Sequence, residues 1–253
     1  MSIEYYIIDP IGNITALVTS NAAKSDYKDI SGRIMAENPG VEQVGFAELK
    51  EDVIKLNMAG GEFCGNATMS AAALKYELSQ NTGEVCRTVL VEPLGVEVKV
   101  NVSGGSGVFD CECLMPPPKE IENYTFFAGG RRYTYPLVCF DGIMHIIADS
   151  DLPENAAEGV IKDLAKQLGA PALGIMIFDK NENRLVPLVY VEAVNTVFFE
   201  KSCASGTCAL AAAMGFCEKT DIIEPGGTMG AQLQKNGISL SLRLKIIKHG
   251  LEE

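Results

Sequence analysis

Apolar and polar residues alternate in short runs along this chain, and these runs are separated by stretches with helical spacing. Every second residue of 96–102 is valine, and every second residue of 238–246 is isoleucine or leucine. A period of two is typical of strands with one buried face. Further strands are predicted over 3–8, 53–58, 108–115, 133–140, 143–148 and 188–194, and helices over 22–37 and 155–168. The pattern predicts an α/β (α+β) chain.

A proline triplet at 116–118 lies close to the midpoint of the chain. Because consecutive prolines fit neither a helix nor a central strand, this segment is predicted to be a linker. We therefore expect two domains, an N-terminal half over residues 1–118 and a C-terminal half over residues 119–253.

Comparison of the chain with itself shows a repeated motif. Residues 64–74 read CGNATMSAAAL, and residues 203–213 read CASGTCALAAA. Each copy has a threonine four residues after its cysteine, and each is followed by a Glu-Pro pair, at 92–93 and at 224–225. The two threonines are expected to pack within the helix or to bond back to the preceding turn. The repeat predicts that each half presents one cysteine, Cys64 or Cys203, at the N-terminus of an Ala-rich helix.

A helix N-terminus offers unpaired amides and a partial positive charge, so it favours a thiolate and binds an anion. If two such termini met at one substrate, the amides around Gly65, Asn66, Ala204 and Ser205 would hold its carboxylate. One cysteine thiolate would remove the α-proton, and the other thiol would protonate the opposite face. This chemistry inverts Cα and requires no metal and no other cofactor.

The net charge, the length of the apolar runs and the number of histidines exclude several classes of function. The net charge of −12 argues against nucleic acid or an anionic membrane as a partner. No apolar run approaches the ~18 residues of a membrane span, and no signal peptide is recognisable, so we expect a cytoplasmic protein with reduced thiols. The two histidines are too few for a multi-His metal site. Cys111 and Cys113 share one face of a predicted strand and are expected in the core.

The motifs resemble the cofactor-independent diaminopimelate epimerase-like racemases over essentially the whole chain. Asn13 lies in a segment similar to the family's opening Gly-x-Gly-Asn, with Asp-Pro in place of its usual His-Gly. Asn57 and Cys64 lie in a segment similar to the first catalytic motif. His145 ends a segment that resembles Gly-Asn-Pro-His, and residues 202–208 resemble Ala-Cys-Gly-[Ser/Thr]-Gly-x-Cys.

The resemblance implies two pseudo-symmetric halves, each a curved, mostly antiparallel sheet around a central helix, with the active site in the cleft. It implies that Cys64 and Cys203 form the acid/base pair and that the last strand can return to the N-terminal half. Asn13, Asn57 and His145 become candidate substrate contacts. Glu200 is either a partner for the substrate ammonium group or an ordinary acid near a helix start. The expected partner is a small amino acid, and a homodimer stays open.

Departures from the family pattern bear on the substrate. Residues 193–196 lack the Glu-Arg pair that diaminopimelate epimerases carry before the second cysteine, and Ile143 replaces an Asn. The resemblance therefore predicts a substrate other than diaminopimelate, with histidine as the leading candidate. Four alternatives stay open: a diaminopimelate epimerase, a proline racemase-like enzyme, a one-base isomerase of the phenazine-biosynthesis type, and a non-catalytic ligand-binding or redox-sensing protein.

Overall fold

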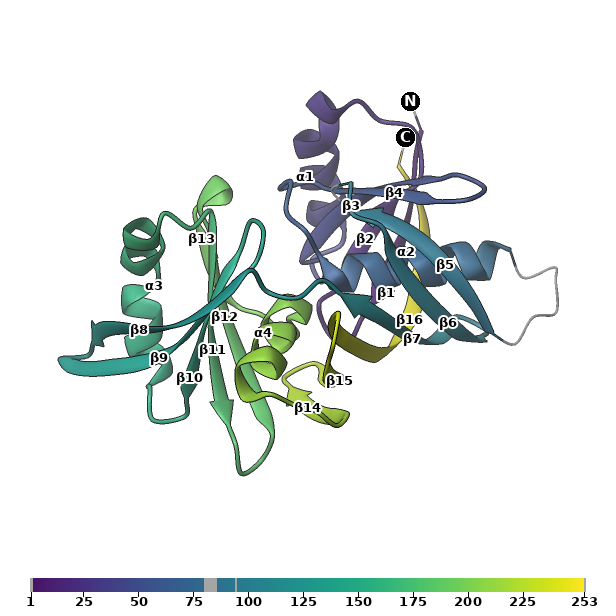
Figure 1. Cartoon of the computed structure of the whole chain (residues 1–253). Coiled ribbons are helices and arrows are strands. Elements are labelled where there is room, and N and C mark those ends of the chain that lie inside the picture. The colour runs from purple at the N-terminus through teal and green to yellow at the C-terminus, as the bar shows by residue number, and fades with distance from the viewer. Residues whose placement is uncertain (1, 80–85, 94, 253) are drawn as a thin grey trace. The chain divides into compact units, whose positions relative to one another are not determined.

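The computed structural model describes residues 2–79, 86–93 and 95–252 and divides the chain into two compact units (Figure 1). Unit 1 consists of Met1–Leu114 and Ser241–Glu253, and unit 2 consists of Met115–Leu240. Strand β16 (Gly237–Glu252) therefore begins in unit 2, and most of it belongs to unit 1.

Unit 1 is a barrel of strands that closes on itself. Its strands are β1 (Ile3–Asp9), β2 (Thr15–Val18), β3 (Gln43–Leu49), β4 (Ile54–Met58), β5 (Cys86–Pro93), β6 (Val98–Gly105) and β7 (Val108–Met115), followed by β16. Strand β16 also pairs with β1, from Ile3 opposite Glu252 to Asp9 opposite Lys245, and this pairing closes the barrel. The helices are α1 (Tyr27–Glu37), preceded by a 3₁₀ turn at Lys24–Asp26, and α2 (Gly65–Leu78).

Unit 2 has a similar order of elements, with one more strand before each of its two helices. Its strands are β8 (Glu120–Ala128), β9 (Arg131–Cys139), β10 (Met144–Asp149), β11 (Ala172–Asp179), β12 (Arg184–Val191), β13 (Thr196–Phe199), β14 (Thr220–Glu224) and β15 (Gly227–Gln234). Its helices are α3 (Glu154–Leu168) and α4 (Ala204–Met214), with a 3₁₀ turn at Glu192–Val194.

The pairing of strands around the helices is the same in both units. The strands before and after α1 are parallel, as are those before and after α3. Parallel pairs also flank α2 and α4, namely β4 with β5 and β12 with β14. The pairings β1–β2, β3–β4, β9–β10 and β11–β12 are antiparallel. The expected fold of two pseudo-symmetric, mostly antiparallel halves is confirmed.

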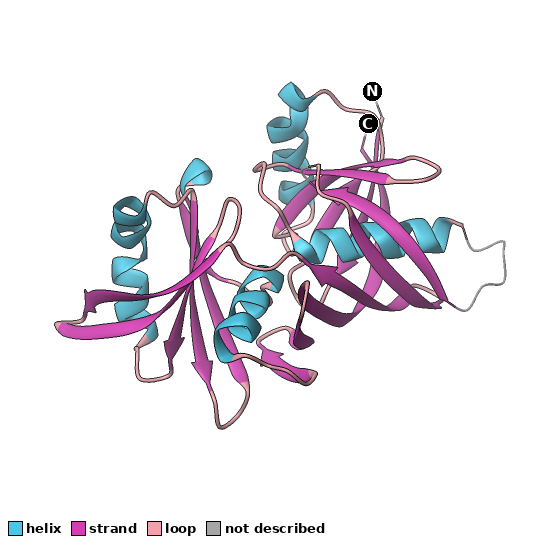
Figure 2. Ribbon diagram, viewed as in Figure 1, coloured by secondary structure: helices cyan, strands magenta, loops and turns pink. Residues whose placement is uncertain are grey.

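Helices α2 and α4 are the central helices of their units (Figure 2). Every residue of α2 from Gly65 to Leu74 is buried, and α4 is buried from Ala204 to Ala211 except at Ser205. A helix that is buried all round shows no apolar stripe. Glycine, alanine, serine and threonine on these helices let the surrounding strands approach closely, so the Ala-rich composition follows from the architecture.

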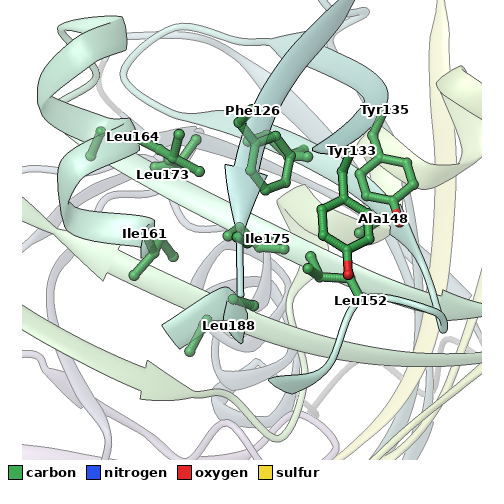
Figure 3. Packing of buried hydrophobic residues seen from close by; sticks show 14 of the residues in the cluster. Phe126, Tyr133, Tyr135, Ala148, Leu152, Ile161, Leu164, Leu173, Ile175 and Leu188 are labelled. Carbon is green, nitrogen blue, oxygen red and sulfur yellow. The ribbon is translucent and has the colours of Figure 1, made fainter. Parts of the chain in front are cut away.

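Helix α3 packs differently, with one apolar face on the sheet of unit 2. Ile161 and Leu164 lie on the face of α3 that is turned toward the strands (Figure 3). Phe126, Tyr133, Leu173 and other strand residues complete this core. The helix ends at Gly169, whose φ of 62° is a left-handed conformation that glycine adopts without strain.

Two predicted elements differ from the structure. The helix expected from residue 22 begins at Tyr27, because residues 24–26 form a 3₁₀ turn with no buried side chain to hold a longer helix. The strand expected over 188–194 lies at Arg184–Val191, and the chain then turns through Glu192–Val194.

Candidate active site

Cys64 is the N-cap residue of α2 in unit 1. Its backbone is extended, with φ −131° and ψ 112°, and its sulfur accepts a hydrogen bond from the Ala67 amide at 3.4 Å. The sulfur therefore lies at the positive end of a central helix, as the repeat predicts. The hydroxyl of Thr68 donates to the Cys64 carbonyl oxygen at 2.8 Å, which confirms the expected bond to the preceding turn.

A network of amide side chains lies beside the Cys64 sulfur. The thiol donates to Gln43 Oε1 over 3.3 Å. Gln43 Nε2 in turn donates to Asn13 Oδ1 at 2.5 Å and to Thr15 Oγ1 at 2.7 Å, and Asn13 donates to Glu42 over 3.4 Å. Asn13 is buried, and Gln43 links its side chain to the Cys64 thiol by hydrogen bonds. These bonds fix the amide of Gln43 with its oxygen toward the thiol.

Cys203 holds the same position in unit 2, as the N-cap of α4 with φ −137° and ψ 100°. It is more deeply buried than Cys64, with 6% of its surface exposed. Its amide N–H donates to Glu224 Oε2 at 2.6 Å, and the hydroxyl of Thr207 donates to Glu224 Oε1 at 2.6 Å. Thr207 is fully buried, in line with the expected packing within the helix, and its hydroxyl bonds to the Glu224 carboxyl group and not to the preceding turn.

The electrostatics of Cys203 oppose the expectation that the helix end favours a thiolate. Burial raises the pKa of the Cys203 thiol well above its usual value, and repulsion by Glu200 and a hydrogen bond with its carboxylate raise it further. Glu224 adds to this effect, whereas the bond to Ser205 opposes it. The thiol form is favoured here because desolvation and the negative charge of Glu200 outweigh the helix end.

His145 lies on β10 with its side chain fully buried, and it shares a hydrogen bond of 3.0 Å between Nε2 and Ser205 Oγ. Ser205 Oγ lies 3.6 Å from the sulfur of Cys203, so these three side chains are consecutive neighbours. Burial lowers the pKa of His145 to about 3, so the ring is neutral at physiological pH. Its Nδ1 has no hydrogen-bond partner among the described residues.

The remaining sequence-predicted residues lie as follows. Gly65 and Asn66 form the buried first turn of α2, and Ala204 forms that of α4 with Ser205. Asn57 is half-buried on β4, where it pairs with Phe46 of β3. In unit 1 the structure thus brings Asn13, Gly65 and Asn66 to the Cys64 end of α2. In unit 2 it gathers His145, Ala204, Ser205 and Glu200 around Cys203.

Sequence reasoning missed three residues at these sites. Thr15 lies on β2 and Gln43 on β3, whereas Cys64 caps helix α2, and no sequence motif connects the two strand residues to the cysteine. Glu224 is part of the repeated Glu-Pro signal, but the repeat alone does not indicate a contact with Cys203. A fourth acid near these sites, Glu62, lies within the first motif, two residues before Cys64, and burial raises the pKa of its carboxyl.

Cys111 and Cys113 are buried on one face of β7, as expected of core residues. Among the residues that the structure describes, no group of three or more His, Cys, Asp or Glu side chains could hold a metal ion. No helix in the described part of the chain combines the length and apolar composition needed to cross a bilayer.

Two curated relatives match nearly the whole chain. A histidine racemase from Fusobacterium nucleatum subsp. nucleatum is 30% identical over 263 residues, covering 98% of this chain and 96% of the relative. A histidine racemase from Staphylococcus aureus is 26% identical over 249 residues, covering 90% and 87%. Among solved structures, a protein from Pseudomonas aeruginosa described as a predicted epimerase has a TM-score of 0.73 at 11% identity, with 98% of each chain covered. This last likeness shows the shared fold.

The fold, the two cysteine-capped central helices and these relatives define the class of protein: an isomerase that acts as a racemase or epimerase. Within that class, the chain belongs to the family described as the histidine racemase CntK N-terminal domain, whose match spans residues 2–247. The non-catalytic alternatives are therefore set aside.

Proposed function

We propose that this protein racemises histidine by a two-thiol mechanism that uses no cofactor, with Cys64 and Cys203 as the acid/base pair. The observation that carries the proposal is that each unit places a cysteine at the N-cap of its buried central helix. Each unit thus supplies one cysteine at a helix N-terminus. A reaction with two proton transfers on opposite faces of one carbon requires two such acid/base groups.

The amides of the first turns supply the binding site for the α-carboxylate in this proposal. Helix N-termini bind anions through unpaired N–H groups, and the residues at these positions are small. They are Gly65, Asn66, Ala204 and Ser205. As the α-proton leaves, negative charge develops on the carboxylate, and the aligned amides stabilise that charge.

The proton transfers then run as follows. A cysteine thiolate takes the α-proton, and the electrons of the C–H bond pass into the carboxylate to form an enediolate. The second cysteine, as a thiol, donates its proton to the opposite face of Cα, and the electron pair returns to form the new C–H bond. Cys203 suits the role of donor for one enantiomer, because burial and Glu200 favour its protonated form. For the other enantiomer the roles exchange.

Histidine as the substrate is supported by the names of the curated relatives, which align with nearly the whole chain. The absence of the Glu-Arg pair at 193–196 supports a substrate without a distal carboxylate. The neutral ring of His145 adds no positive charge near Cys203, so it does not repel the ammonium group of an amino-acid substrate. Glu200 is proposed to bind the substrate ammonium group, with its carboxylate beside Cys203.

The test is proton exchange in D₂O with reduced protein, L-histidine and no added cofactor, followed by NMR and chiral chromatography. We expect D-histidine to form with deuterium at Cα, while the remaining L-histidine keeps its proton early in the reaction. This labelling pattern distinguishes two bases from one, because a single base would return the abstracted proton to the product. Product that retains its proton, or no exchange with histidine, would contradict the proposal; diaminopimelate and proline serve as comparison substrates.

The cysteine variants sharpen this test. Cys64→Ala and Cys203→Ala are each expected to reduce racemisation by at least about 10²-fold, the lower end of what one acid or base contributes. Any residual exchange should be confined to one enantiomer, and to opposite enantiomers in the two variants. Cys217→Ala, which removes an exposed thiol, is the matched control and should keep the parent rate. Full activity in either test variant would contradict the two-thiol mechanism.

A further inference from the structure

Glu224 ends β14 with its carboxyl buried against the first turn of α4. Only 3% of the residue is exposed. One oxygen accepts the amide N–H of Cys203, and the other accepts the hydroxyl of Thr207, both at 2.6 Å. Cys203 is the N-cap of α4, and Thr207 lies four residues later, where its own amide donates to the Cys203 carbonyl oxygen. The carboxyl therefore ties together the two ends of the turn that carries the thiol.

The corresponding turn of unit 1 is built without this bridge. Thr68 follows Cys64 as Thr207 follows Cys203, but the hydroxyl of Thr68 donates to the Cys64 carbonyl oxygen at 2.8 Å. The matching acid of the repeat, Glu92, is half-buried on β5, in register with Lys55 of β4. Because the same helix start forms with a different bond, the carboxyl bridge is a property of the Cys203 turn and not a requirement of the fold.

The charge of this carboxyl is coupled to the thiol beside it. Burial raises the pKa of Glu224 to about 8, against the lowering effect of its bonds from Thr207 and Cys203. Ionised Glu224 in turn raises the pKa of the Cys203 thiol. Glu200 also lies at this turn and repels both Glu224 and Cys203, and neutral His145 reaches the thiol through Ser205. Lys201 lies two residues before Cys203, and its carbonyl oxygen accepts the amide of Gly226.

We propose that Glu224 is a positioning residue for Cys203: it fixes the first turn of α4 through its two hydrogen bonds, and when ionised it adds its negative charge to that of Glu200 beside the thiol. It acts through Cys203 and does not touch the substrate. The inference rests on the proposed function in one respect, namely that Cys203 is the reacting thiol.

The test uses Glu224→Gln, which keeps an oxygen to accept from Cys203 and an NH₂ group to donate to Thr207, but carries no charge. The readout is the pH dependence of iodoacetamide alkylation at Cys203, resolved by peptide mass spectrometry in the full-length protein. We expect Cys203 to be alkylated about tenfold faster at pH 9 in this variant, with Cys64 unchanged. Glu92→Gln is the matched control and should leave both rates unchanged. Equal alkylation of Cys203 in Glu224→Gln and the parent would overturn the proposal.

Steady-state kinetics supply the second readout. In Glu224→Gln the pH profile of kcat should shift to lower pH, while KM stays within about twofold. Glu224→Leu, which lacks both hydrogen bonds, should lose at least tenfold in kcat across the whole profile. A kcat that falls equally at every pH in Glu224→Gln would reduce Glu224 to a structural role and overturn the charge argument. A shifted alkylation profile with an unshifted kcat profile would support the positioning role and count against Cys203 as the reacting thiol.

Discussion

At Gly206, in the first turn of α4, an added methyl group would contact both Met176 and the sulfur of Cys203. A Cβ there would lie 2.2 Å from Met176 Sδ and 3.3 Å from the Cys203 sulfur, whereas ordinary contact begins at 3.4 Å. Met176 is fully buried on β11, and its terminal methyl already lies against Gly174, where a Cβ would be 2.6 Å away. Met176 therefore has no room to move toward that glycine.

Two effects of Gly206→Ala oppose each other. Alanine in place of glycine stabilises a helix by about 0.5–1 kcal/mol, whereas overpacking a buried site costs about 1–3 kcal/mol. Because the overlap with Met176 exceeds 1 Å, overpacking should win, and the variant should lose about 1–2 kcal/mol of stability. Displacement of the Cys203 sulfur should lower racemisation by up to about 10²-fold, since misplacing a reacting group by about 1 Å has that effect.

The assay is thermal denaturation combined with the racemisation rate. Gly159→Ala is the matched control: it also lies inside a helix, but a Cβ there meets nothing within 4 Å, so helix propensity should act alone and raise stability. Met176→Ala in the Gly206→Ala background should relieve the overlap, so the two changes should couple favourably by about 1–3 kcal/mol. A Gly206→Ala protein as stable and active as the parent would refute the reasoning.

Two further predictions concern the core and the pH dependence of stability. Ile161→Ala in the fully buried face of α3 should cost about 2–5 kcal/mol in chemical denaturation, and a loss no greater than that of half-buried Val160→Ala would contradict the described packing. Between pH 3 and 6.5 the unfolded chain binds a proton that native His145 does not, so this residue makes stability rise with pH by about 1.4 kcal/mol per unit. His145→Gln should remove that contribution, seen as a parent-minus-variant difference that grows with pH in urea denaturation; Glu224, whose contribution falls between pH 4.5 and 8, cancels in the comparison. A constant difference would show that His145 does not titrate as described.

The sequence predicts the elements whose patterning is local. The valine alternation predicts β6, and the isoleucine and leucine alternation predicts the long last strand. The repeated cysteine motif predicts the starts of both central helices, because all these signals lie within about ten residues. The partners of the two thiols could not be predicted in this way. Gln43 and Glu224 are each 21 residues from the cysteine that they contact, and both contacts depend on how strands pair around a helix. The deep burial of Cys203, which reverses the expected effect on its pKa, is likewise a tertiary property.

The return of β16 to unit 1 has a consequence for how the protein is made. Ile3 lies opposite Glu252, so the first and the last described strands are neighbours. During vectorial synthesis, residues 2–114 emerge long before the strand that closes their barrel, and the facing edges of β1 and β7 must wait for it. Unit 2, by contrast, ends at Leu240, so all of its residues are translated before the part of β16 that closes unit 1. Unit 2 is therefore able to mature first, and the half that begins the chain is the last to be completed.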